Sequence, residues 1–170
     1  MDSYLERLRQ EITSATDGMS REELTSRPEG KWSTAEILEH LYMTYTGTQR
    51  AFERCLKAGK PLATVPTFKQ RVAATAVTEF GYFPTGRKSP DQVYPRGMSA
   101  EKVVADIGPQ IAAMDKAIAQ CEERYGSRIK VLDHPVLGPL TAQQWRKFHL
   151  IHGRHHARQI LKLRTTKRPS

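Results

Sequence analysis

The sequence predicts an all-α fold: a four-helix bundle with a long, partly helical crossover between the second and third helices. Four segments carry the apolar spacing of amphipathic helices, two of them open with a capping box, and a stretch rich in Pro and Gly separates the second from the third. A length of 170 residues suits one domain with a sizeable core. We therefore expect residues 1–170 to form a single domain.

Apolar spacing alone marks the first and third helices. The first is expected over roughly residues 2 to 16, with Leu5, Leu8 and Ile12 on one side. The third, about residues 99 to 124, contains Pro109, which is expected to kink it. Its apolar residues recur at spacings of three and four, as in the seam of a bundle: Val104, Ile107, Ile111, Met114, Ile118 and Cys121.

Capping boxes mark the starts of the second and fourth helices. Ser33-x-x-Glu36 opens the second, which is expected to end near Leu56, before a Gly and a Pro that cannot continue it. Thr141-x-x-Gln144 opens the fourth, which is expected to run to about Arg164. In both boxes the two side chains cap each other's backbone amides.

About forty residues, 59 to 98, connect the second and third helices. A structureless loop of that length is improbable, so the stretch from Thr67 to Phe80 is expected to form one short helix. The remainder, including Phe80-Gly81-Tyr82-Phe83-Pro84, is expected to cover one mouth of the bundle. Its aromatic residues would either line a pocket or pin the loop to the core.

Composition points to a cytoplasmic protein without membrane association. Hydrophobic residues make up 38% of the chain and charged residues 26%, as in globular proteins. No apolar run approaches the roughly 20 residues of a membrane span, and the N-terminus lacks a signal-peptide core. Cys55 and Cys121 form no CxxC pair and are interpreted as core residues of a protein in a reducing compartment.

The net charge of +9 raises the possibility of a nucleic-acid-binding module. The basic residues are scattered, however, and the densest group follows the last helix, where cations also favour the helix dipole. We therefore expect a solvated basic tail and no nucleic-acid partner. That group consists of Lys162, Arg164, Lys167 and Arg168.

Four of the six histidines fall within residues 149 to 156. On a helix, His152 and His156 lie one turn apart on a mainly apolar face, which is a spacing that metal ligands use. His149 with His152 is the weaker alternative, and His155 should point toward the edge of the face. His134, just before Pro135, is interpreted as a loop residue on the surface or a pocket rim.

His40 is the candidate third ligand, because it lies on another helix among residues that include Thr44, Gly47 and Ala51. These small residues would let a neighbouring helix approach. The alternative is a core of histidines without metal. Metal ligation is favoured because neutral imidazoles aimed at each other in an apolar stripe would each need hydrogen-bond partners, whereas a cation stabilises the deprotonated rings.

Two motifs resemble the DinB-like superfamily: Trp32-Ser33 followed by Glu39-His40-Leu41, and His152-Gly153-Arg154-His155-His156. The approach Pro135-Val136-Leu137-Gly138-Pro139-Leu140-Thr141 is also typical. The resemblance implies a metal held by His40, His152 and His156 at one end of a four-helix bundle. It also implies a range of activities, because family members include thiol-dependent S-transferases, isomerases and metal-dependent hydrolases.

Three neutral imidazoles would leave a divalent ion, zinc or nickel, with an open coordination position. The sequence therefore favours a metal-dependent enzyme acting on a small-molecule substrate, by transfer of a low-molecular-weight thiol or by hydrolysis. Glu36, one turn before His40, is a candidate general base or orienting group, and it is also the cap partner of Ser33. Gln159 and Arg54 would bind substrate or have structural roles. A non-enzymatic metal-binding protein is the alternative, and the apolar face of the first helix allows a homodimer.

Overall fold

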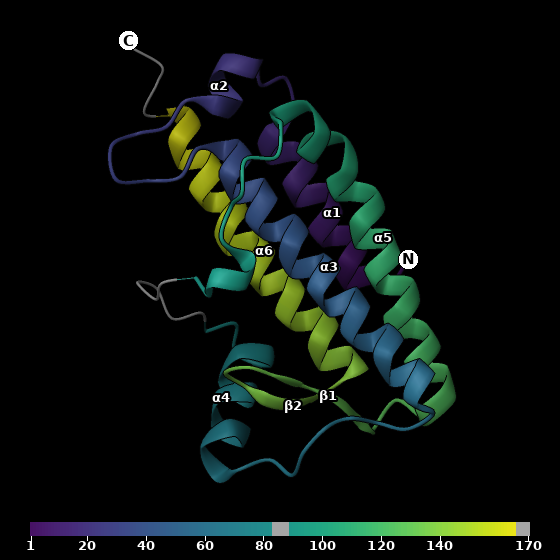
Figure 1. Ribbon diagram of the computed structural model, residues 1–170. Coiled ribbons are helices and arrows are strands. Elements are labelled where there is room, and N and C mark those ends of the chain that lie inside the picture. Colours follow the sequence, from purple (N-terminus) through teal and green to yellow (C-terminus); the bar gives the residue numbers. More distant parts are fainter. Residues whose placement is uncertain (83–88, 166–170) are drawn as a thin grey trace.

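A computed structural model describes residues 1–82 and 89–165, and these residues are mostly helical with one small sheet (Figure 1). The all-α class is confirmed. The elements in order are α1 (Ser3–Thr16), α2 (Arg21–Thr25), α3 (Thr34–Ala58), α4 (Phe68–Thr78), the 3-10 helix η1 (Asp91–Val93), α5 (Ala100–Tyr125), β1 (Lys130–His134), β2 (Gly138–Thr141) and α6 (Ala142–Thr165).

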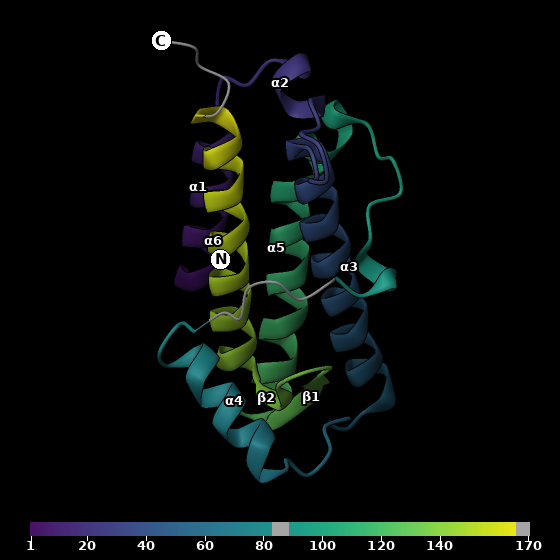
Figure 2. The same cartoon turned by 90° about the vertical axis from the view of Figure 1, so that its left-hand side faces the viewer.

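The four long helices run side by side, with α3 packed along α5 and α1 along α6 (Figures 1 and 2). Their facing sides form the hydrophobic core. Burial of this apolar surface is the main stabilising contribution to such a fold. The largest side chains fully buried there are Tyr45, Phe52, Leu5, Leu8, Ile12, Leu38, Leu41, Ile111, Met114, Ile118, Leu140 and Ile160.

The four long helices begin and end within about two residues of the predicted positions. Ser33 and Glu36 exchange both hydrogen bonds of the capping box at the start of α3. Thr141 and Gln144 do the same at the start of α6. At the other end of α3, Gly59 has a φ of 71°, the left-handed conformation in which glycine ends helices.

The predicted short helix in the crossover is confirmed as α4, which begins at its own capping box of Thr67 and Gln70. Among the described aromatic residues that follow, Phe80 and Tyr82 are exposed to solvent and do not pin the loop to the core. Phe80 is 82% exposed and Tyr82 64% exposed. Phe83 and Pro84, like Lys167 and Arg168, lie outside the described residues.

The β1–β2 hairpin and α2 were not predicted. The two strands pair antiparallel, with Leu132 opposite Leu140 and His134 opposite Gly138. Pro135 in the turn and Pro139 in β2 obscure the strand pattern in the sequence. A two-stranded sheet has only edge strands, and these tolerate proline because the missing amide can face away from the partner strand.

The seam of α5 differs from the prediction at its first position. Val103 is fully buried, whereas Val104 is 40% exposed. The two valines project about 40° and 60° from Ile107 around the helix axis, so the apolar period cannot choose between them. α5 itself continues through Pro109.

The prediction that Gly47 lets a neighbouring helix approach is wrong, because that residue is exposed. The close approach occurs instead at Gly153 of α6. A Cβ there would collide with Cδ1 of Leu8 on α1 and lie 3.2 Å from the hydroxyl of Tyr45. Glycine at this position therefore sets the distance between α1 and α6.

Cys55 and Cys121 are both buried and free, as the prediction of core cysteines required. Among the helices of residues 1–82 and 89–165, none combines the length and the apolar character of a membrane-spanning segment.

Candidate metal centre

His40 of α3 and His152 and His156 of α6 bring their Nε2 atoms together between the two helices. Nε2 of His152 lies 3.3 Å from Nε2 of His40 and 3.0 Å from Nε2 of His156. One nitrogen from each ring falls within 4.8 Å of the other two. All three side chains are buried, with exposures of 3 to 7%.

These separations suit ligands of one small cation. Zinc–nitrogen bonds are about 2.0 Å long, so two nitrogens of a tetrahedral sphere lie about 3.3 Å apart. The distance from His152 to His40 has this value, and the distance to His156 is slightly shorter. The three histidines can therefore hold a divalent metal ion.

Hydrogen bonds at the far side of the rings fix the proton positions of two ligands. Nδ1 of His40 lies 2.9 Å from the carbonyl oxygen of Val93, and Nδ1 of His156 lies 2.8 Å from Oε1 of Gln159. Because these oxygens only accept hydrogen bonds, both Nδ1 atoms donate, and each neutral ring keeps a lone pair on Nε2.

Both lone pairs face Nε2 of His152. One proton on that nitrogen could form a good hydrogen bond to only one of them, and the other contact would place two lone pairs against each other. A cation among the three nitrogens would satisfy all three lone pairs. This mismatch favours a metal centre over a core of histidines without metal.

Burial keeps the imidazoles in the neutral form that binds metals. It lowers the pKa of His40, and with the neighbouring His40 it lowers the pKa of His156 to about 3. The pKa of His152 is also held well below its ordinary value, first by burial and then by His156. An imidazolium here would lose its hydration and be repelled by any second positive charge.

Gln159, whose role the sequence left open, links two histidines of α6. Its Oε1 accepts the hydrogen bond from Nδ1 of His156, and its Nε2 lies 3.0 Å from Nε2 of His155. His155 therefore lies beside the cluster without contributing to it. Such partners of metal-binding histidines orient the ring and make it a better ligand.

Glu39, for which no role was predicted, fixes the chain segment next to His40. Its buried carboxylate accepts hydrogen bonds from the backbone amides of Arg96, Gly97 and Met98, at 2.8, 3.1 and 3.0 Å. Gly97 has a φ of 94°, which helps turn successive amides toward one anion. One signal in the sequence could have indicated this role. Glu39 is an acidic residue directly between Leu38 and His40, two residues of α3 that are buried.

We call residues 91–98 the strap, because hydrogen bonds join this segment to two neighbouring residues of α3, Glu39 and His40. Val93 accepts the hydrogen bond from His40, and Glu39 binds the amides near the other end. The ring of Trp32 contacts both α3 and the strap. Its centroid lies 5.3 Å from the ring centroids of His40 and of Tyr94. The strap therefore covers the ring of one candidate ligand.

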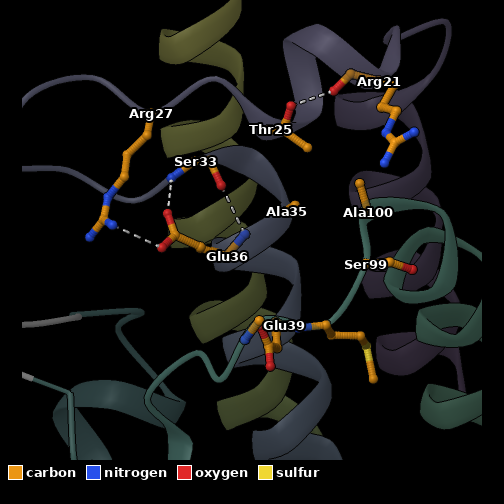
Figure 3. Close-up of a pocket in the computed structure, with 11 residues that line it drawn as sticks. Arg21, Thr25, Arg27, Ser33, Ala35, Glu36, Glu39, Ser99 and Ala100 are labelled. Atoms are coloured by element: carbon orange, nitrogen blue, oxygen red, sulfur yellow. Dashed lines mark hydrogen bonds and ion pairs between the residues drawn. The ribbon is translucent and has the colours of Figure 1, made fainter.

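Glu36 lies in a different environment from the histidines. It lines a cavity of about 290 Å³ at the N-terminal ends of α3 and α5 (Figure 3). Its carboxylate accepts from the amide of Ser33 at 2.7 Å and pairs with Arg27 at 3.5 Å. Because this carboxylate is already engaged in the helix cap and in an ion pair, we assign it a structural role.

His149 and His134 stay outside the cluster. His149 is fully buried and stacks on Trp145, with ring centroids 5.7 Å apart. His134 ends β1 with its ring 4.3 Å from that of Phe148, and its Nδ1 accepts from the amides of Val136 and Leu137. The prediction of a loop histidine is corrected, because packing against α6 makes His134 part of the hairpin's inner face.

Two arginines lie outside the cluster. Arg54, a candidate for substrate binding or a structural role, is exposed on α3. Arg146 of α6, for which no role was predicted, is 6% exposed and lies 3.3 Å from Asp115 and 2.5 Å from Glu122. Because α6 is packed on more than one side, a single apolar stripe does not describe its buried surface.

The fold and the site together define a class of protein. This is a mostly helical protein with a candidate metal centre of three buried histidines between α3 and α6. Comparison with known proteins then gives the family. The family model of the DinB superfamily matches residues 4–160, so the chain belongs to this superfamily and the resemblance inferred from the sequence is confirmed.

The chain is also similar to YuaE of Bacillus subtilis (strain 168), which is described as an uncharacterized protein. The two are 26% identical over 165 residues, covering 95% of this chain and 96% of YuaE. No solved structure gave a significant match.

Proposed function

We propose that this protein binds one divalent metal ion, zinc or nickel, through His40, His152 and His156 within a DinB-type four-helix bundle. We further propose that it is a metal-dependent enzyme acting on a small molecule. The observation that carries the proposal is the convergence of three buried Nε2 atoms, two of them on rings whose Nδ1 atoms already donate. This arrangement matches the outer hydrogen bonding of metal-binding histidines.

A bound ion would supply Lewis acidity, because three neutral ligands leave its double charge intact and at least one coordination position open to a water or a thiol. The chain's own residues position the ligands. The carbonyl of Val93 and the amide of Gln159 hold two of the rings. Phe148 stacks on the third, His152, with ring centroids 5.5 Å apart.

Metal content tests the first half of the proposal. Plasma mass spectrometry on untagged wild-type protein is expected to find about one zinc or nickel per chain, as three convergent imidazoles predict. His152→Ala should lose it. His155→Ala is the matched control, because it removes a neighbouring imidazole on the same helix that is not a ligand. Metal-free wild type after reconstitution, or equal loss in both variants, would contradict the assignment.

Cobalt substitution tests whether the centre has an open position, as an enzyme requires. Visible absorption of the Co²⁺ protein should change when a small thiol is added, because the thiol would enter the coordination sphere. A spectrum that does not respond to thiol or azide would indicate a saturated sphere. That result would favour a non-enzymatic metal-binding protein. A response justifies assays for thiol transfer and for hydrolysis.

A further inference from the structure

A crevice of about 360 Å³ lies between α4 and the β1–β2 hairpin. These elements lie at the opposite end of the molecule from α2 (Figures 1 and 2). Its polar lining comes from three elements: Gln70, Arg71 and Thr75 from α4, Lys130 from β1 and Gln144 from α6. A volume of this size suits a small molecule.

The charged residues in the lining are both cations, Arg71 and Lys130. Among residues 1–82 and 89–165, neither side chain forms an ion pair. Nζ of Lys130 donates to a neutral partner, Oε1 of Gln144, at 2.7 Å. Burial, and then the charge of Arg71, lowers the pKa of Lys130. Two cations facing one space without a carboxylate repel each other, and an anion between them would reverse the sign of that interaction.

The side-chain oxygens of the two glutamines that line the crevice already accept hydrogen bonds. Oε1 of Gln70 accepts from the amide of Thr67 at 2.9 Å. Oε1 of Gln144 accepts from the amide of Thr141 as well as from Lys130. Because these oxygens are occupied, each side-chain amide offers its NH₂ group. The polar surface of the crevice is therefore rich in hydrogen-bond donors.

We propose that this crevice is a binding site for a small oxyanion, either a phosphate or a carboxylate, held by Arg71 and Lys130 with the amides of Gln70 and Gln144 as further donors. A guanidinium binds two oxygens of such a group in its plane, and an ammonium adds a compact charge. The site goes beyond the proposed metal centre. Gln144 precedes His152 by eight residues on α6, which is about 12 Å along the helix axis, and the two sites share no residue.

The test is calorimetric titration of inorganic phosphate, and separately of succinate, into metal-free protein at constant ionic strength. Saturable binding of at least one of the two is expected. Arg71→Gln and Lys130→Gln should each weaken binding roughly tenfold or more, because each removes a charge-assisted hydrogen bond. Lys69→Gln is the matched control: the residue is exposed on the same helix and outside the lining, so its loss should change affinity by no more than about twofold.

Absence of saturable binding of both anions would overturn the proposal. Equal weakening by Lys69→Gln would also overturn it, because binding would then follow net charge alone. Binding of only phosphate or only succinate assigns the oxyanion class. Because Lys130 is half-buried, the folding of Lys130→Gln is checked by circular dichroism. If that variant unfolds, Arg71→Gln still tests the proposal, because Arg71 is exposed. Repeating the titration in His152→Ala separates this site from the metal centre, since binding should be unchanged there.

Discussion

The side chain of Gln159 illustrates how a single residue can tune the candidate centre. It accepts from Nδ1 of His156 and so holds Nε2 toward His152. We expect Gln159→Ala to lower metal affinity roughly 10- to 100-fold, because the ring loses its orienting acceptor. Competition with a chromogenic chelator measures the change. Gln159→Glu keeps an acceptor and should retain affinity, so similar losses in both variants would refute this role.

His149 should cost stability rather than provide it. Within the described residues, neither of its ring nitrogens has a hydrogen-bond partner, and burial lowers its pKa to about 3. An unsatisfied buried donor costs about 1 to 3 kcal/mol. We therefore expect His149→Leu to raise the free energy of unfolding of the metal-free protein at pH 7, as measured by urea denaturation.

The same residue predicts a pH dependence. Unfolded His149 has an ordinary pKa of 6.5 and folded His149 one of about 3, so the unfolded chain binds more protons between these values. Stability should therefore fall as the pH drops below about 6.5, with His149 contributing about 2 kcal/mol of the loss by pH 5. In His149→Leu this contribution disappears. Identical pH profiles of the two metal-free proteins would contradict the prediction.

At the scale of elements, the strap depends on Glu39. Glu39→Ala should release the amides of residues 96 to 98, and hydrogen exchange in peptides covering them should accelerate. Metal affinity should fall as well, because the strap also carries the carbonyl that orients His40. Glu39→Gln keeps one acceptor oxygen and should give intermediate exchange. The later turns of α5 serve as internal reference for exchange. If the amides of residues 96 to 98 stay equally protected in Glu39→Ala, Glu39 does not hold the strap in place.

Elements also show the limit of sequence patterns. Periodicity and capping boxes located the four long helices and α4, because both signals act within a few residues. The hairpin was not predicted, because its prolines oppose the usual strand pattern. The strap was not predicted either, because its partner, Glu39, lies more than fifty residues away along the chain.

At the scale of the whole molecule, Arg146 ties α6 to α5 and to the N-terminus. Its guanidinium lies 3.3 Å from Asp115, 2.5 Å from Glu122 and 3.9 Å from Asp2. Arg146→Met should destabilise the fold by about 3 to 5 kcal/mol, since it leaves the carboxylate of Asp115 buried without its cation. Urea denaturation of the metal-free protein measures this.

The control for Arg146 is the pair of Arg154 and Glu11, which also joins α6 to another helix but has both side chains about one-third exposed. Arg154→Met should cost no more than about 1 kcal/mol, because solvent screens such pairs. If the two methionine variants lose equal stability, the buried network has no special role in holding the helices together.

Local sequence patterns predicted the helical class, the ends of the long helices and the pairing of His152 with His156, because all of these depend on contacts within one or two helical turns. They also proposed His40, yet only the packing of α3 against α6 brings that ring within 3.3 Å of His152, 112 residues away. The burial of Arg146, the attachment of the strap to Glu39 and the crevice at Arg71 and Lys130 likewise depend on tertiary packing. Each of these joins residues from separate elements, and a local pattern carries no information about which elements will meet.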